Sequence, residues 1–370
     1  MATWKVPFVD PREHYRRIKP ELDGAFLDCL TNGDLIQRHH LSEFEKHFAE
    51  FCGTRHCVGL NSGYHALALS LLAAGVGPGH EVITVAHTFV ATVSAIVHAG
   101  ATPVLVDVAE DYNMDMGLLE KAITPRTKCI LPVHLNGRVC DMERLQKIAD
   151  KHNILIIEDA AQSIGGEFKG KRAGSFGVAG CFSFYPFKML GCAGDGGAVT
   201  TNDPAIARAV TLLRYNGEDR ETREYHCHGY TALLDNVQAA ILEVKLRHLP
   251  EWITHRRHLA GLYHKALGGI PEVRIPKFAE DHCFDVFQNY VIRVPRRDEL
   301  KDFLNANGVE IIVSWAKPMW QHLGLRLGEQ NLPETEAICR EVLSLPMSAE
   351  TTEEHVQITA GLVRKFYSGI

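Results

Sequence analysis

One lysine of this chain stands where a neutral, nucleophilic amine could form. Lys188 lies in the aromatic and apolar run 181–191, just before the glycine-dense segment 194–198. Burial among apolar groups disfavours the ammonium form and lowers the pKa of a lysine, and a neutral amine can form a Schiff base with an aldehyde. The alternative is a lysine whose stem covers apolar surface while its ammonium reaches water. That alternative is the commoner arrangement, so other residues must decide.

A carboxylate and an amide follow a predicted strand at 154–158. Asp159 comes directly after the strand, and Gln162 comes three residues later. In a parallel sheet, ligands gather beyond the carboxyl ends of the strands, so these two side chains could address adjacent edges of one flat ligand. Capping of a following helix is an equally common role for Asp159.

Two other predicted strand ends are suited to a phosphate and to a flat ring. Ser62 and Gly63 open a helix, where free N–H groups and the helix dipole attract an anion, although simple capping by Ser62 also explains them. Phe89 follows the strand 81–85 and could stack on a flat ligand. In isolation, a place in the core is the more common role for such a phenylalanine.

These segments are jointly complementary to a flat, phosphorylated aldehyde, and pyridoxal 5′-phosphate (PLP) meets each requirement. Asp159 would keep the pyridine nitrogen protonated, which makes the ring an electron sink. Lys188 would hold the aldehyde and move protons once it is displaced. Phosphate contacts are predicted for four residues: Ser62, Gly63, Tyr64 and Ser183.

The elements that must position these residues follow an α/β pattern. Short apolar runs predict strands, listed in chain order: 58–61, 81–85, 103–107, 129–133 and 154–158. Helical patterns separate them, for example at 62–74 and 88–99. Strands that are apolar on both faces and alternate with helices indicate a largely parallel sheet covered on two sides.

The last third of the chain has a different pattern. A long helical stretch at 233–249 is expected to break at Pro250, before a second helix. Further along, the pattern predicts one strand and three helices: 289–294, then 297–307, 333–343 and 351–366. Such a mixture is typical of a smaller α+β unit.

These patterns divide the chain into two predicted domains. A large PLP-binding domain is expected at 15–249 and a small C-terminal domain at 250–370, with residues 1–14 packed on the small one. A length of 370 residues suits this division.

Composition excludes several classes of protein. The net charge of −6 provides no basic field for nucleic acid or for an anionic membrane. No apolar run reaches the length that spans a bilayer, and the start of the chain has no signal-peptide core. The ten cysteines are scattered singly, which favours a reducing cytoplasm. The cluster 226–228 (His-Cys-His) lacks partners at tetrahedral spacing, so no metal site is predicted.

The motifs, in their order, resemble the DegT/DnrJ/EryC1/StrS family of sugar aminotransferases. The resemblance covers nearly the whole chain. Its clearest segments include Gly-His-Glu-Val-Ile at 79–83, Val-His-Leu-Asn-Gly at 133–137, Ile-Glu-Asp-Ala-Ala-Gln at 157–162 and Phe-Ser-Phe-Tyr-Pro-Phe-Lys at 182–188. It implies fold type I of the PLP enzymes: a large three-layer α/β/α domain with a mainly parallel sheet, plus a smaller C-terminal α+β domain.

The family pattern also implies roles by position. Lys188 matches the lysine that binds the cofactor aldehyde, Asp159 the partner of the ring nitrogen, and Gln162 the contact to the ring hydroxyl. Phe89 matches the stacking aromatic residue. The phosphate cup is matched by Ser62, Gly63, Tyr64 and Ser183.

Three positions depart from the family pattern. Tyr64 replaces the usual threonine or serine of the phosphate cup. Thr231 replaces an asparagine that reaches the cofactor phosphate of the neighbouring subunit, so Thr231 is the candidate for that contact. The usual His-Tyr-Pro of the small domain reads Ser-Trp-Ala at 314–316.

The resemblance implies an aminotransferase that converts a nucleotide-linked keto sugar into an amino sugar, with L-glutamate as donor. It also implies a cytoplasmic homodimer, in which the segments around 214–217 and 230–231 cross to the partner. The pathway, for a polysaccharide or an antibiotic, stays open. One alternative is a PLP-dependent sugar dehydratase; the family's dehydratases replace the lysine by histidine, so Lys188 favours transamination. Another is a non-catalytic sensor, against which the presence of Lys188, Asp159 and Gln162 argues.

Overall fold

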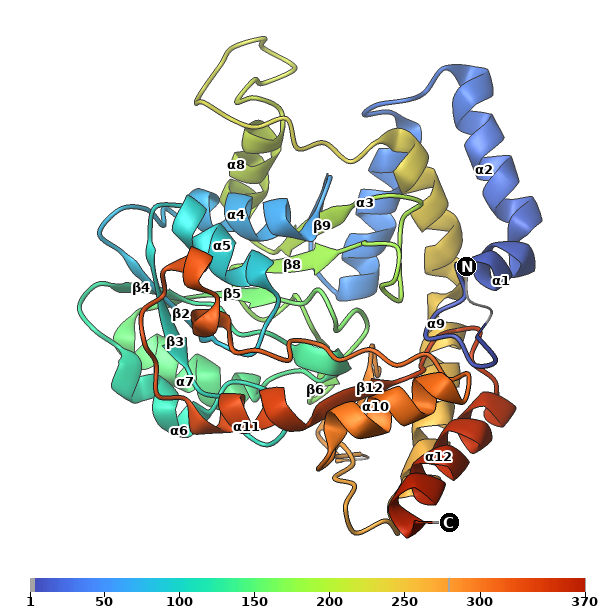
Figure 1. Ribbon diagram of the computed structural model, residues 1–370. Coiled ribbons are helices and arrows are strands. Elements are labelled where there is room, and N and C mark those ends of the chain that lie inside the picture. Colours follow the sequence, from blue (N-terminus) through green and yellow to red (C-terminus); the bar gives the residue numbers. More distant parts are fainter. Residues whose placement is uncertain (1–3, 279, 370) are drawn as a thin grey trace.

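A seven-stranded sheet forms the centre of the computed structural model, which describes residues 4–278 and 280–369 (Figure 1). The strand order is β1-β9-β8-β5-β4-β2-β3, and β9 runs antiparallel to both neighbours whereas the other neighbouring strands pair in parallel. The mainly parallel sheet expected from the sequence is therefore confirmed. The strands are β1 (His56–Leu60), β2 (Glu81–Val85), β3 (Thr102–Val106), β4 (Thr127–Ile130), β5 (Leu155–Asp159), β8 (Ala179–Ser183) and β9 (Gly197–Thr201).

Helices cover this sheet on two sides. In Figure 1, α4, α5 and α8 lie above the strands and α6 and α7 lie below them. The helix α3 contacts β1 and packs against α9. These helices are α3 (His39–Cys52), α4 (Gly63–Ala73), α5 (Val90–His98), α6 (Met116–Leu119), α7 (Met142–His152), α8 (Pro204–Arg214) and α9 (Asn236–Leu267).

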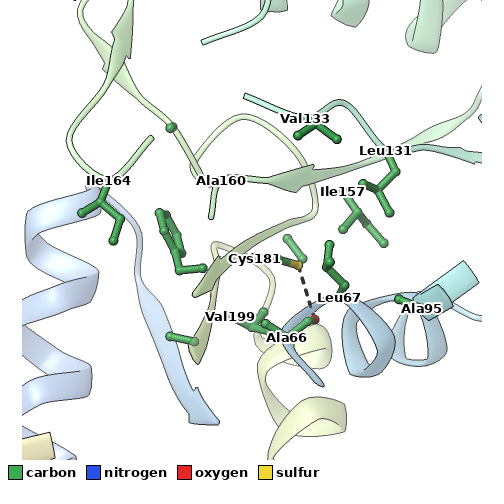
Figure 2. Close-up of a cluster of buried hydrophobic side chains, with 14 of the residues drawn as sticks. Ala66, Leu67, Ala95, Leu131, Val133, Ile157, Ala160, Ile164, Cys181 and Val199 are labelled. Carbon is green, nitrogen blue, oxygen red and sulfur yellow. Dashed lines mark hydrogen bonds between the residues drawn. The ribbon is translucent and has the colours of Figure 1, made fainter. Parts of the chain in front are cut away.

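The helix α4 packs closely on the sheet at β8. The buried thiol of Cys181 in β8 lies 3.3 Å from the carbonyl oxygen of Ala66 in α4 (Figure 2). Small side chains at both positions allow this approach, because packed interiors leave few voids. Apolar residues of neighbouring elements, such as Leu67, Ile157 and Val199, fill the surrounding space.

A second hydrophobic cluster belongs to the C-terminal part of the chain. It surrounds an antiparallel pair of strands, β11 (Tyr290–Arg293) and β12 (Val342–Leu345). Three helices accompany the pair: α10 (Arg297–Ala306), α11 (Pro333–Glu341) and α12 (Glu353–Ser368). The remaining elements are short or N-terminal: α1 (Pro11–Arg17), α2 (Lys19–Asn32), β6 (Glu167–Phe168), β7 (Lys171–Arg172), β10 (Cys283–Phe284), and the 3-10 helices η1 (Glu120–Ala122), η2 (Leu135–Gly137), η3 (Met319–Gln321) and η4 (Leu323–Leu325).

The N-terminal segment contacts this C-terminal part. Val6 forms a parallel bridge with Val309, and the N–H of Phe8 donates to the carboxylate of Glu310 at 2.8 Å. Residues 1–3 of the segment predicted to pack there lie outside the described residues.

One prediction about the last third is wrong. The helix α9 continues through Pro250 instead of breaking there. A proline inside a helix costs about 3 kcal/mol, but α9 buries apolar side chains on both sides of it, from Leu249 to Leu259. The helix predicted at 333–343 is confirmed as α11, but it ends at Glu341, because Val342 begins a buried strand that pairs with β11. The predicted domain boundary at 249/250 thus falls within one continuous helix that contributes to both hydrophobic clusters.

Among the described residues, no helix combines the length and the apolar character that crossing a bilayer requires.

Gly180 in β8 provides a test of how tightly the site's scaffold is packed. A Cβ at this position would lie 2.2 Å from the Cα of Gly174, so Gly180→Ala must displace backbone. We expect the free energy of unfolding to fall by about 3 kcal/mol, the upper range for overpacking. Urea unfolding followed by circular dichroism measures the change.

Gly361 in α12 is the matched control. A Cβ there would meet nothing within 4 Å, so Gly361→Ala should raise the free energy of unfolding by about 0.5–1 kcal/mol through helix propensity. Equal stability of the two variants would contradict this account of the β8 packing.

Candidate active site

A cavity of about 480 Å³ opens at the carboxyl ends of β1, β2, β4, β5 and β8. Its lining brings together side chains that are more than 100 residues apart in the chain. Eight of the nine residues predicted from the sequence line it: Ser62, Gly63, Tyr64, Phe89, Asp159, Gln162, Ser183 and Lys188.

Lys188 borders the cavity from the loop after β8. Its N–H donates to the carbonyl of Tyr185 at 2.8 Å, which forms a turn, and its side chain is half-buried. Burial lowers the pKa of Lys188 to about 8, while the negative charge of Asp159 opposes the shift. A substantial fraction of this amine is therefore neutral near physiological pH, unlike that of an exposed lysine.

Asp159 ends β5 and is buried beneath the cavity. One carboxylate oxygen accepts a hydrogen bond from the Thr92 hydroxyl at 2.8 Å, and the other accepts from the Ala161 N–H at 3.2 Å. Burial raises the pKa of Asp159, and these two hydrogen bonds act in the opposite direction. In the described structure no helix follows at 160–166, so the capping role considered for this aspartate is wrong.

Gln162 is oriented by a neighbouring loop. Its carbonyl oxygen accepts a hydrogen bond from the Asn136 N–H at 2.8 Å. Because the oxygen is engaged by the protein, the NH₂ group is the end of this amide that a ligand oxygen could use.

Ser62 and Gly63 form a narrow cradle at the start of α4. The Ser62 hydroxyl caps the helix by accepting a hydrogen bond from the His65 N–H at 3.1 Å. The first N–H groups of a helix have no acceptor within the helix itself. A Cβ on Gly63 would lie 2.6 Å from the Cβ of Ser183, so only glycine fits here. The cradle is therefore the size and polarity that an anion such as phosphate requires.

Tyr64 contributes differently from the serine or threonine that the family pattern has there. Its hydroxyl pairs with Nδ1 of His98 at 2.6 Å. The hydroxyl is thus engaged outside the cradle, and the backbone N–H is the group that Tyr64 can direct at an anion.

Phe89 lies at the mouth of the cavity and not in the core. It precedes α5 and is 60% exposed, which makes the core alternative wrong. A ring in this position has a free face on which a flat ligand can stack.

Thr231 does not line this cavity, although its carbonyl accepts a hydrogen bond at 3.4 Å from the side chain of Asn61, the residue before Ser62. It is exposed, and its hydroxyl lies 3.1 Å from the side-chain oxygen of Asn216. Both residues belong to the segment between α8 and α9, which projects from the body of the molecule (Figure 1).

Sequence reasoning missed several residues of the lining. Thr88 precedes α5 and Thr92 lies in its first turn, and the Thr88 hydroxyl pairs with that of Thr92, which donates to Asp159. That spacing was visible in the sequence. Trp315, in the segment 314–316 that departs from the family pattern, comes from the C-terminal part of the chain and reaches the cavity with a positive φ of 54°.

These groups fit PLP. The glycine-walled cradle suits a phosphate, the buried carboxylate suits a protonated ring nitrogen, and the amine of lowered pKa suits an aldehyde. Each lies in the same cavity.

Comparison with known proteins gives the class. A sequence profile of the DegT/DnrJ/EryC1/StrS aminotransferase family matches residues 16–364, and the chain belongs to this family. It is 42% identical, over 93% of its own length and 92% of the relative's, to dTDP-3-amino-3,4,6-trideoxy-alpha-D-glucose transaminase of Streptomyces venezuelae. It is 39% identical, over 98% of both chains, to a pleiotropic regulatory protein of Geobacillus stearothermophilus.

Solved structures agree with this assignment. The crystal structure of S. venezuelae DesV in complex with a ketimine intermediate superposes with a TM-score of 0.95 at 40% identity, covering 98% of this chain and 99% of DesV. Other similar structures were determined with PMP or PLP bound. The chain is thus a PLP-dependent sugar aminotransferase with the fold-type-I architecture that the sequence predicted.

The lowered pKa of Lys188 predicts an unusual titration in the protein without cofactor. An acylating reagent labels only the neutral amine, so labelling of Lys188 should be half-maximal near pH 8. Lys169 is an internal control, because its ion pair with Glu143 raises its pKa. Mass spectrometry of labelled peptides at a series of pH values measures both.

The variant Asp159→Asn removes the negative charge that holds the Lys188 pKa up, so the midpoint should fall further. In the wild-type protein, a labelling midpoint for Lys188 near that of Lys169 would show that the Lys188 amine is not buried as the structure indicates.

Proposed function

We propose that this enzyme transfers the amino group of L-glutamate to a nucleotide-linked keto sugar, and that Lys188 and Asp159 carry the chemistry. One observation supports the roles above all others: a lysine amine of lowered pKa shares a cavity with a buried carboxylate and a glycine-walled helix start. The transaminase relative from Streptomyces venezuelae supports the substrate class.

Three residues of the cavity have chemical roles in the proposed reaction. Bound PLP would supply an aldehyde for an amine and a ring that withdraws electrons. In the first half-reaction, Nζ of Lys188 would move a proton from the α-carbon of the amino donor to the bound cofactor. In the second half-reaction it would move a proton the opposite way, from the cofactor to the sugar carbon. Asp159 stabilises a positive charge at the ring nitrogen, and Gln162 donates its NH₂ to the ring hydroxyl.

Binding and orientation fall to the rest of the cavity. Ser62, Gly63, Tyr64 and Ser183 hold the phosphate, the last through its hydroxyl. Phe89 stacks on the ring and keeps water from one of its faces.

A homodimer is part of the proposal. The helix α2 leaves Phe26, Leu27 and Leu30 largely exposed on one side, an apolar surface suited to a second copy of the chain. Across such an interface, the projecting segment that carries Thr231 reaches the partner's phosphate cradle. All ten cysteines are free thiols, which supports a reducing cytoplasm.

A regulatory role is the second candidate, because the Geobacillus stearothermophilus relative is named as a regulator. A pure sensor would not need an amine of lowered pKa. The dehydratase alternative would release no amino sugar.

Addition of L-glutamate should bleach the visible absorption of the holoenzyme, since the first half of the reaction removes the aldehyde. With a keto sugar nucleotide as the second substrate, initial rates should give the parallel lines of ping-pong kinetics. Lys188→Ala is the control and should lose at least about 1,000-fold in rate, since it removes both nucleophile and base.

Three outcomes would count against the proposal. Intersecting lines would exclude the shared site. Loss of the sugar's hydroxyl without nitrogen transfer would identify a dehydratase. Unchanged function of Lys188→Ala in cells would favour the regulator.

The dimer predicts both a mass and a cofactor effect. Sedimentation of the holoenzyme should give about twice the 41.2 kDa of the chain. Thr231→Val should weaken PLP binding about tenfold or more, the effect of losing one hydrogen bond to a charged group. Thr222→Val, in the same segment, is the matched control and should leave the affinity unchanged. An active, PLP-loaded monomer would refute this arrangement.

A further inference from the structure

Gln288 holds the backbone on both sides of Lys188. Its buried carboxamide accepts from the N–H of Met189 at 3.0 Å and donates to the carbonyl of Phe187 at 3.1 Å. These two groups belong to the peptide units that immediately precede and follow Lys188. A single side chain from outside the large sheet therefore fixes the stretch of backbone from which the lysine projects.

The next residue makes equivalent contacts to the amide of the site. Nδ2 of Asn289 lies 3.5 Å from the side-chain oxygen Oε1 of Gln162 and 3.3 Å from the side-chain oxygen Oδ1 of Asn136. The N–H of Asn136 donates to the same Gln162 oxygen. Asn289 thus completes the set of donors that orients Gln162.

The loop that carries Asn136 is pressed against the same segment. Asn136 has a positive φ of 57°, and the following Gly137 accepts a hydrogen bond from the Val286 N–H at 3.0 Å. A Cβ on Gly137 would lie 2.6 Å from the backbone nitrogen of Phe287. Glycine is required for this approach, and the loop has no room to shift independently.

The segment 286–289 is itself anchored in the C-terminal part of the chain. Nη1 of the buried Arg256 donates to the carbonyls of Phe287 and Gln288 at 3.1 and 3.2 Å, and to that of Met347 at 2.8 Å. Directly after it, Tyr290 begins β11 within the second hydrophobic cluster. The residues that contact Gln162 and the backbone around Lys188 therefore belong to the C-terminal part of the chain, and not to the large sheet beside which Lys188 and Gln162 lie.

We propose that Gln288 and Asn289 are positioning residues, through which the C-terminal unit sets the placement of Lys188 and Gln162 relative to each other. The inference rests on the roles proposed above for those two residues. Because consecutive residues hold both groups, displacement of the start of β11 against the sheet moves the amine and the amide together. The C-terminal unit thus acts on the reacting centre through Gln288 and Asn289, in addition to supplying Trp315 to the cavity wall.

The experiment compares substitutions at these two positions. Gln288→Met keeps the volume and removes both hydrogen bonds; Gln288→Glu keeps the acceptor for Met189 but sets a carboxylate against the Phe187 carbonyl. Asn289→Leu removes the donor to Gln162. Tyr290→Phe is the matched control, because it removes one partly buried hydrogen bond, to His264, from the adjacent residue.

Two measurements separate positioning from plain structural support. In the holoenzyme, the pH midpoint of the visible absorption should shift by about half a unit or more in Gln288→Met and Gln288→Glu, since the environment of the lysine changes. In the apoprotein, the rate of PLP capture should fall at least about fivefold, since the amine is less well oriented. The kcat should fall about tenfold or more while KM for the sugar stays within about twofold. Asn289→Leu should weaken PLP binding about threefold or more.

Tyr290→Phe should change none of these quantities. Wild-type midpoint, capture rate and kcat in a folded Gln288→Met would overturn the inference. If that variant does not fold, the other two variants test the inference. Wild-type midpoint, capture rate and kcat in Gln288→Glu, together with wild-type PLP affinity in Asn289→Leu, would overturn it. Borohydride reduction of wild-type holoenzyme, followed by peptide mapping, tests the underlying assignment separately: a label on any residue other than Lys188 would show that the proposed function of that lysine is wrong, whatever Gln288 does.

Discussion

Removal of water from a lysine and a carboxylate at one edge of a sheet is the constraint on which this structure depends. Each group loses solvation, and the losses act in opposite directions: burial lowers the pKa of Lys188 and raises that of Asp159. Their mutual attraction opposes both shifts. The lowered pKa leaves part of the Lys188 amine neutral near physiological pH, unlike the amine of an exposed lysine, so the rest of the fold must keep water away from the pair.

Side chains alternate along β5, so this one strand provides both a carboxylate for the cavity and a carboxylate that binds the surrounding loops. Asp159 faces the cavity, whereas its neighbour Glu158 points into the protein and is fully buried. Glu158 accepts hydrogen bonds from His134 and from the N–H groups of Gly174, Phe176 and Gly177, at 2.7–3.0 Å. One carboxylate is thus left for chemistry, and the other ties the surrounding loops to the strand that carries it.

The large sheet alone does not complete the site. Lys188 is held by Gln288, Gln162 is approached by Asn289, and the cavity is walled by Trp315, all from the C-terminal part of the chain. The helix α9 runs through both hydrophobic clusters and carries Arg256, which anchors the segment 286–289. The continuity of α9 through Pro250 therefore matters for the site, since it makes the relation between the two units part of one rigid element.

The sequence by itself determined the parallel sheet and most of the cavity lining. Strand ends are readable from apolar runs, and residues that follow parallel strands must meet at one edge, which is why Ser62, Phe89 and Asp159 could be predicted. Tertiary structure decided what no local pattern encodes. It kept α9 helical through Pro250, turned 342–345 into a strand, and engaged the Tyr64 hydroxyl with His98. Gln288 and Trp315 reach the site through packing between segments that are far apart in the chain. The free energy of such packing depends on tertiary contacts, which the local sequence pattern does not specify.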